Sequence, residues 1–323
     1  MQMITLSKLA KLANVSVSTA SKAFSGSSEV NEKTRNMIFD IAKKHRCFKK
    51  FYNVKYPKLV IAIIAPEFKS AYYTRYLSYI QENLEKENCE LCVSTTNFSP
   101  EKEQDLLEYY YKHSNVDGII VIQSALDAVR EYEIPVVFVN PSRSQPHRDS
   151  ASRDAFQAFR DAVQYLVDKK VHSIGFIGEK LTHKKQQMLQ QILEEQGIPL
   201  KENYVSISGA RFEEGGYTAM EKLFSQNQLP RAIFCAYDYM AIGAIRCIYD
   251  HGLTVPGDIA VLGYDDIPEA RFLNPPLASI SVPMEKLCQI AADSIIRKIH
   301  GSTVDCSCQV ASEFKLRRSF EIS

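Results

Sequence analysis

Tryptophan is missing from this chain of 323 residues, and so is any apolar run long enough to cross a membrane. The longest uninterrupted apolar stretch is residues 59–65, whereas a transmembrane helix needs about 20 apolar residues. The N-terminus also lacks an apolar segment followed by a cleavage site. We therefore expect a cytoplasmic protein with no membrane partner.

Several short motifs that mark enzymes are missing as well. The chain contains no G-x-S-x-G, no P-loop G-x-x-x-x-G-K-[ST], no H-E-x-x-H and no G-x-G-x-x-G after a strand. The seven histidines lie far apart and show no metal-ligand spacing. We therefore expect no enzyme, with no catalytic residues, no cofactor and no resident metal.

The eight cysteines are scattered, and in a chain of this length without an export signal they indicate reduced thiols rather than disulfides. Cys89, Cys92, Cys306 and Cys308 leave a zinc or redox site open as an alternative. That alternative is weak, because Cys89 and Cys92 border a predicted strand on which an odd separation points side chains to opposite faces.

Acidic residues are scarce in the first 58 residues, which we call the head. Twelve lysines and arginines stand there against only Glu29, Glu32 and Asp40, a formal charge of +9 that leaves −8 for the remaining body. A small basic head on an acidic body indicates that the head binds a polyanion. A solvated lysine-rich tail would be poor in apolar residues, and the head is not.

Three short helices are predicted in the head, preceded by the capping residues Thr5, Ser16 and Asn31. Asn14 tolerates the left-handed conformation and turns the chain between the first two helices. Such an arrangement predicts a helix-turn-helix unit. Apolar residues at helical spacing predict the buried faces: Leu6, Leu9, Ala10 and Ala13, then Ala20, Ala23 and Phe24, then Met37, Ile38, Ile41 and Ala42.

Beyond residue 58, apolar runs alternate with helical patterns. Such runs are typical of parallel strands buried on both faces, so two parallel α/β units follow the head. Strands are predicted at 59–65, 90–96, 118–122, 135–140, 173–178, 204–208, 232–236 and 259–265. Helices are predicted near 73–87, 100–113, 154–169, up to 196, 214–226, 238–251 and 285–299, with a short helical segment between 122 and 135 and a polar loop before 154.

The string ITLSKLAKLANVSVSTASKAFSGSSEVNEKTR resembles, over its whole length, the DNA-binding head of the LacI/GalR family of bacterial transcription repressors. The resemblance implies that the second helix lies in the major groove, where Val17, Ser18 and Lys22 face base edges. Lys22 replaces the usual arginine and reaches guanine as a point charge rather than a rigid fork. The implied contacts to the DNA backbone are Thr5, Ser7, Ser16, Thr19, Ser21 and Asn31. Capping or solvation is the alternative for each of these taken alone.

The linker departs from the family pattern of Tyr-x-Pro-Asn followed by a short helix that wedges an Ala and a Leu into the minor groove. Residues 47–56 read CFKKFYNVKY, with neither the Pro nor the Ala and Leu in place. An apolar wedge is still available from Tyr52 or Tyr56, and the lysines suit phosphates. A disordered basic tether is the alternative.

The body resembles the effector-binding domain of the same family, which is related to periplasmic sugar-binding proteins. The segments VDGIIVI, IPVVFVN and, above all, residues 230–287 carry this likeness. It implies two lobes with a ligand cleft between them and three crossing strands as a hinge. The implied divisions are 1–46 for the helix-turn-helix domain, 47–58 for the linker and 59–323 for the effector-binding and dimerisation domain, with lobe 1 at about 59–155 plus 285–310 and lobe 2 at about 160–282.

The family's effector contacts carry over to this chain with departures. Lys185 stands where a ligand-binding arginine is usual, Tyr237 replaces an amide, and Ala155 replaces the asparagine that usually follows Asp154. Asp265 is the strongest match, because a carboxylate at the end of a strand accepts two ligand hydroxyls; capping of its loop is the alternative. The implied effector-binding residues are Tyr73, Asp154, Lys185, Arg211, Phe212, Tyr237, Asp238 and Asp265.

These features predict a ligand-responsive DNA-binding regulator, a repressor of a carbohydrate-utilisation operon that binds a palindromic operator as a homodimer. The predicted effector is a sugar, a sugar phosphate or a sugar acid, since cationic pocket residues and the lack of tryptophan make an anionic ligand as reasonable as a plain sugar. A cytoplasmic sugar-binding or sugar-processing protein without a role on DNA is the alternative.

Overall fold

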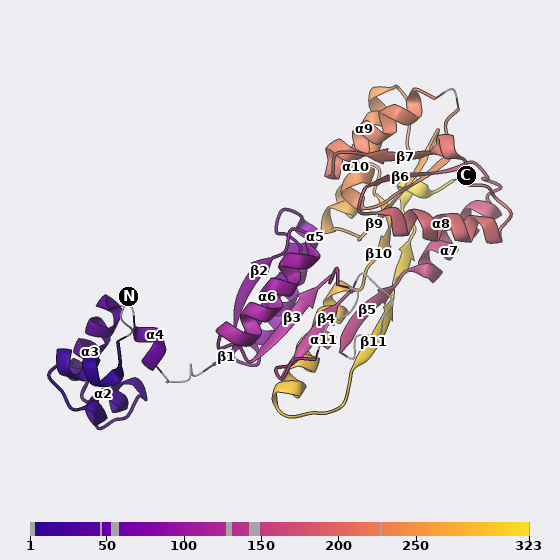
Figure 1. The fold of residues 1–323 in the computed structure, drawn as a ribbon. Coiled ribbons are helices and arrows are strands. Elements are labelled where there is room, and N and C mark those ends of the chain that lie inside the picture. The colour runs from indigo at the N-terminus through magenta and orange to yellow at the C-terminus, as the bar shows by residue number, and fades with distance from the viewer. Residues whose placement is uncertain are drawn as a thin grey trace. The chain divides into compact units, whose positions relative to one another are not determined.

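The computed structural model describes residues 4–45, 47–52, 58–126, 131–141, 149–226 and 228–322. The chain divides into two compact units, Met1–Leu59 and Val60–Ser323 (Figure 1). The first unit contains the head and the second contains the body. In the described residues, no helix has both the length and the apolar character that crossing a membrane requires.

The head is a bundle of short helices, and its predicted caps are confirmed. Thr5, Ser16 and Asn31 each accept a hydrogen bond from a backbone amide three residues later. Asn14 has a φ of 52°, so the predicted left-handed turn is present. The helices are α1 (Leu6–Leu12), α2 (Val17–Phe24), α3 (Glu32–Lys44) and α4 (Phe48–Phe51).

The buried face of α3 differs from its prediction at one position. Met37 is 41% exposed, whereas Ile38 and Ala42 are fully buried. Phe39 takes part in the core instead, with its ring 5.2 Å from that of Phe24. The expectation that Met37 is buried was therefore wrong, because the larger aromatic ring turns α3 toward α2.

The helix α4 lies at the start of the predicted linker and packs on the head. The ring of Phe48 is 4.9 Å from Phe39, and that of Phe51 is 5.7 Å from Phe24. Tyr52, predicted as a minor-groove wedge, stacks on Phe48 at 4.8 Å and keeps 39% of its surface exposed. Cys47, Phe48 and Phe51 therefore pack in or against the core of the head, while Tyr56 lies outside the described residues.

The body contains two six-stranded sheets in its described residues. Their orders are β11-β5-β4-β3-β1-β2 and β12-β10-β9-β8-β6-β7. All described pairings are parallel except that of β12 with β10. The first sheet contains β1 (Leu59–Ala65), β2 (Cys89–Thr95), β3 (Gly118–Ile122), β4 (Val136–Val139), β5 (Ser150–Asp154) and β11 (Ser307–Ala311). The second contains β6 (Ile174–Glu179), β7 (Val205–Ser208), β8 (Ala232–Cys235), β9 (Ala260–Tyr264), β10 (Ala278–Ser281) and β12 (Glu313–Lys315).

Helices cover both faces of each sheet, as Figure 1 shows. On the first sheet, α5 and α11 pack together on one face, while Leu107 and Tyr110 of α6 pack on the other against Ile64 and Val121. On the second sheet, α9 and α10 cover one face and α7 and α8 the other. The bounds are α5 (Ala71–Glu85), α6 (Pro100–His113), α7 (Phe156–Asp168), α8 (His183–Glu195), α9 (Phe212–Phe224), α10 (Asp238–Asp250) and α11 (Met284–Ile299).

We call the half built on the first sheet lobe 1 and the half built on the second lobe 2. The chain passes between them after β5, after β10 and after β11. The end of the chain joins lobe 2, where the buried Phe320 lies against Phe234 and Tyr165. These passages give the body a two-lobed fold of the periplasmic-binding type.

The sequence did not predict β5, β10, β11 and β12. Their sequences, SASRD, ASIS, SCQVA and EFK, lack the continuous apolar run by which the other strands were predicted. The helical segment expected between 122 and 135 is not found in the described part of that stretch, and residues 127–130 lie outside it. The remaining predicted elements agree with the structure to within a few residues.

Candidate functional site

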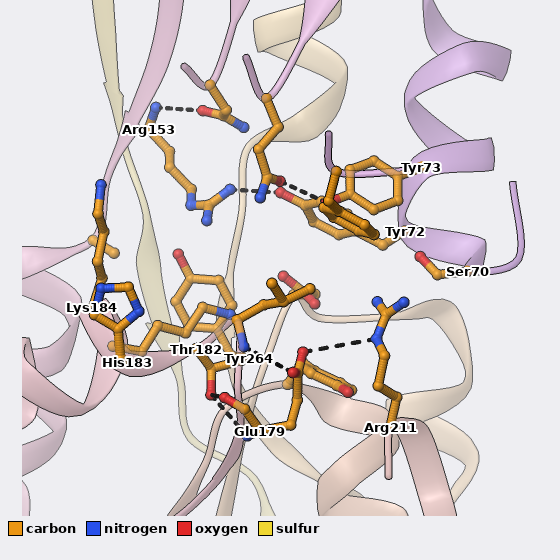
Figure 2. Close-up of a pocket in the computed structure, with 18 of the residues that line it drawn as sticks. Ser70, Tyr72, Tyr73, Arg153, Glu179, Thr182, His183, Lys184, Arg211 and Tyr264 are labelled. Carbon is orange, nitrogen blue, oxygen red and sulfur yellow. Dashed lines mark hydrogen bonds and ion pairs between the residues drawn. The ribbon is translucent and has the colours of Figure 1, made fainter. Parts of the chain in front are cut away.

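A cavity of about 450 Å³ lies between the two lobes (Figure 2). Its walls come from the carboxyl ends of strands in both sheets, because Gln123 and Asn140 follow β3 and β4 while Glu179 and Asp265 lie at the ends of β6 and β9. Ligands of open parallel sheets bind at this edge. The cavity is therefore the candidate ligand site.

Most of the predicted effector residues line this cavity, but Asp154 and Asp238 do not. The exposed Asp154 accepts a hydrogen bond from the amide of Phe156 at 2.9 Å and so starts α7. The predicted residues that do line it are Tyr73, Lys185, Arg211, Phe212, Tyr237 and Asp265.

Asp238 is a buried structural carboxyl, contrary to its expected place in the cleft wall. Its Oδ1 accepts from the hydroxyl of Ser279 at 2.7 Å, and its Oδ2 accepts from the amide of Ile267 at 2.8 Å. Gly263 leaves room for it, since a Cβ there would lie 2.0 Å from Oδ1. Burial, and then the nearby Asp265, raises the pKa of Asp238 to about 8. The residue therefore joins segments of lobe 2 and does not line the cavity.

Two cations of the cavity wall lie around the ring of Tyr264. The guanidinium of Arg153 lies 5.5 Å from this ring and donates to the hydroxyl of Tyr72 at 2.5 Å. The ammonium of Lys185 lies 3.5 Å from the same ring and donates to the carbonyl of Ala236 at 2.5 Å. Both cations interact electrostatically with Asp265. This group therefore contains two cationic side chains and one carboxyl.

Desolvation changes the acid–base behaviour of this group. It lowers the pKa of Lys185 to about 8, although the charge of Asp265 opposes the change. It also raises the pKa of Asp265, against the opposing charges of Lys185 and Arg153. The two groups thus hold their charges at a cost that a ligand able to pair with them would offset.

An ion-pair triad at the cavity connects the lobes. Nη1 of Arg211, at the start of α9, donates to Oε2 of Glu67 in lobe 1 at 2.9 Å. Nε of Arg211 lies 3.7 Å from Oε1 of Glu179 in lobe 2. Figure 2 shows Arg211 and Glu179 in the cavity that also receives Arg153 and Tyr264. Both carboxylates are buried, so Arg211 neutralises charge that water does not reach.

Backbone strain gathers around the cavity. Gln123, Asn140, Phe212 and Asp265 have φ angles of 51°, 48°, 59° and 101°, in the region that favours glycine. Residues held in this region cost of order 1–3 kcal/mol each and persist where surrounding bonds impose them. Asp265 is held by its amide, which donates to the carbonyl of Ile280 at 2.9 Å. The site is therefore built into the fold before any ligand arrives.

The head presents a separate polar surface on α2. Val17, Ser18 and Ser21 are exposed, and Lys22 keeps 43% of its side-chain surface. Exposed Thr5, Ser7, Ser16 and Asn31 lie at or near the starts of the helices, where the side chains of Thr5, Ser16 and Asn31 accept cap bonds. Thr19 is half-buried, with its hydroxyl 2.8 Å from that of Ser16. These positions are the ones that the sequence predicts to meet DNA.

Comparison with known proteins assigns the head and the body of this chain to known domain families. Residues 5–46 match the model of bacterial regulatory proteins of the lacI family, and residues 163–320 match that of the periplasmic binding protein-like domain. The chain belongs to the LacI family. It is therefore a DNA-binding transcription regulator, and the helix-turn-helix interpretation of its head is confirmed.

Named relatives of this LacI-family chain are regulators rather than enzymes. The HTH-type transcriptional repressor PurR of Klebsiella pneumoniae (strain 342) is 29% identical over 312 residues, which cover 92% of this chain and 91% of the relative. Catabolite control protein A of Priestia megaterium is 27% identical over 330 residues, covering 98% and 99%. A structure described as the transcriptional regulator CelR-cellobiose complex has a TM-score of 0.70 at 23% identity, covering 98% and 100%.

Several cavity residues of this LacI-family chain were missed from the sequence. Glu179 ends β6 as Asp265 follows β9, so the rule that selected Asp265 would have found it. Gln123 and Asn140 likewise follow apolar strands. Arg153 could not be found this way, because it lies in β5, which reads as a polar loop. In the described residues no three His, Cys, Asp or Glu side chains gather as metal ligands, and the cysteines are free thiols.

The pKa of Lys185 predicts a pH-dependent stability. Between about pH 8 and 10.5 the folded protein holds Lys185 neutral while the unfolded chain holds it protonated, so stability rises with pH across this window. This contribution of Lys185 to the free energy of unfolding is complete above pH 10.5 and is lost as the pH falls through 8. Urea unfolding from pH 7 to 10.5 should show this rise in the wild type relative to Lys185→Met.

Lys222→Met is the matched control, since exposed Lys222 also donates to a backbone carbonyl, that of Ile207. Its curve should run parallel to that of the wild type. If the stability of Lys185→Met changed with pH as that of the wild type does, this result would contradict the lowered pKa of Lys185.

Proposed function

We propose that this chain is a ligand-responsive repressor that binds a palindromic operator as a homodimer and controls a carbohydrate-utilisation operon. One short recognition helix reads few base pairs, so paired half-sites and a two-fold dimer supply the remaining specificity. In this proposal residues 1–46 bind DNA, 47–58 link the parts, and 59–323 bind the effector and dimerise, with the lobe limits predicted above.

The surface of the head supports its proposed contacts. Val17, Ser18 and Lys22 would face bases, since they lie on the exposed side of α2. Hydroxyl and amide groups would hold the DNA backbone, together with the formal charge of +9 on the head. The proposed backbone contacts are Thr5, Ser7, Ser16, Thr19, Ser21 and Asn31.

The cavity between the lobes is the observation that carries the effector proposal. Its charged groups come from both lobes, so a ligand there contacts both and favours one arrangement of them. Asp265 would accept ligand hydroxyls, and rings such as Tyr73, Phe212 and Tyr237 would pack on apolar faces of a sugar. The cellobiose named with the structural relative supports a carbohydrate. A sugar, a sugar phosphate and a sugar acid all fit this chemistry.

Lys185 and Arg211 are the two residues expected to pair with an anionic group of the effector. Arg211 is already bound to Glu67 and lies beside Glu179. Arg153 and Lys185 donate instead to uncharged oxygens. A phosphate or carboxylate of the effector would therefore lie toward these two residues rather than toward Arg211.

Lys22→Ala tests the DNA-binding part. We expect operator binding to weaken by about 1–3 kcal/mol and the preference at one base pair of each half-site to relax. The operator is first selected from randomised duplexes with the wild type, and affinity is then measured by gel shift over a range of salt. Lys44→Ala, which removes the same charge from α3, should weaken all duplexes alike. A uniform loss in Lys22→Ala too would show that Lys22 reads no base.

A further inference from the structure

Glu29 is an acidic side chain beside the proposed reading surface of a head that is otherwise strongly basic. Its Oε2 lies 2.5 Å from Nζ of Lys22, and both side chains are exposed, by 66% and 43%. A carboxylate near phosphates opposes binding to DNA. Its position therefore has to be explained by something other than affinity for the DNA backbone.

The loop between α2 and α3 holds Glu29 in place. Nη2 of Arg35 donates to the carbonyls of Ser27 and Val30, at 2.7 and 3.0 Å, on either side of Glu29. The side chain of Val30 is buried in the core of the head. The amide of Ser27 also donates to the carbonyl of Lys22 at 3.1 Å. The backbone that carries Glu29 is thus tied to the end of the recognition helix.

The ion pair changes what Lys22 can do. A free lysine is a flexible point charge that serves phosphates and guanines alike. Paired with Glu29, the ammonium is held in one place, part of its charge is neutralised, and its remaining N–H groups point away from the carboxylate. The second carboxylate oxygen of Glu29 remains an acceptor next to these donors.

We propose that Lys22 and Glu29 act as one unit that reads a single G·C base pair, with Glu29 as a specificity-determining residue. In the major groove a G·C pair presents two adjacent acceptors on guanine and then a donor on cytosine. Lys22 matches the guanine acceptors and Glu29 the cytosine amino group. An A·T pair places its donor between two acceptors, so the same unit leaves one group unmatched. This inference rests on the proposed function of α2.

The test is a selection of half-sites from randomised duplexes with the full-length wild type, Glu29→Ala and Asp40→Asn. The wild type should select a two-fold sequence with one G·C position per half-site preferred about tenfold or more. Glu29→Ala should reduce that preference about tenfold and leave the other positions unchanged. Both variants should bind random duplex a few-fold more tightly, because each removes one negative charge from an exposed site on the head.

Each outcome separates this inference from the proposed function. If the wild type enriches no sequence, specific operator binding fails and the inference fails with it. If the wild type enriches an operator but Glu29→Ala retains every base preference and matches Asp40→Asn, operator binding stands and the reading role of Glu29 is overturned. A loss of preference spread evenly over the half-site would also overturn it, because a folding defect in α2 acts on all positions.

Discussion

Replacing Arg211 by methionine will lower the free energy of unfolding by about 3 kcal/mol at pH 7. The guanidinium is the only charge of opposite sign that the described structure places in an ion pair with the buried Glu67 and Glu179. Methionine keeps the apolar stem but leaves two carboxylates uncompensated across the junction of the lobes.

Urea unfolding of the body or the full chain measures this effect. Arg246→Met is the control, because Arg246 forms an exposed pair with Asp250 one turn along α10, and such pairs contribute little. Glu67→Gln in the Arg211→Met background should recover part of the loss. Equal losses in the two arginine variants, or no recovery, would show that the triad does not hold the lobes together.

A thermal-shift screen of sugars, sugar phosphates and sugar acids will find a compound that stabilises the protein by about 2.7 kcal/mol at a concentration of 100 Kd. This value follows from binding to the folded state alone. Asp265→Asn should abolish most of the stabilisation, because its carboxylate is the proposed acceptor for ligand hydroxyls. Asp161→Asn, which changes an exposed carboxyl of α7, should leave the stabilisation intact.

The same compound should change the operator affinity of the full-length protein in a gel shift. Contacts with both lobes give the ligand different affinities for different arrangements of them, and linkage passes that difference to the DNA. Release and tighter binding both fit the proposal. A compound that still stabilises the Asp265→Asn variant would show that the pocket residues are mapped wrongly. A compound that stabilises the protein without changing its DNA affinity would remove the allosteric part of the proposal.

The helices of the head and the buried strands of the body depend on local chemistry, which sequence reading captures well. Thr5, Ser16 and Asn31 cap helices because a side-chain oxygen reaches an amide three residues on. Asn14 adopts the left-handed conformation that it tolerates better than most residues. Apolar runs such as residues 59–65 form central parallel strands because both faces of the sheet are covered.

The candidate site could be predicted less completely than the fold, because residues at similar positions in the sequence have different surroundings in the structure. Asp238 and Asp265 both follow strands of lobe 2, yet one is sealed by Ser279 and Ile267 while the other lines the cavity. Nothing in the order of residues separates them; the path of β10 does.

The sequence by itself determined the two-part organisation, the helix-turn-helix head, the parallel α/β body and six residues of the cavity wall, because periodicity, caps and family motifs are local features. Only the tertiary structure decided that Arg153 enters the cavity from β5, that Arg211 is held by carboxylates from both lobes, and that Lys22 pairs with Glu29. Each of these depends on segments that meet only after folding, and burial then sets which charges are paired and which remain for a ligand.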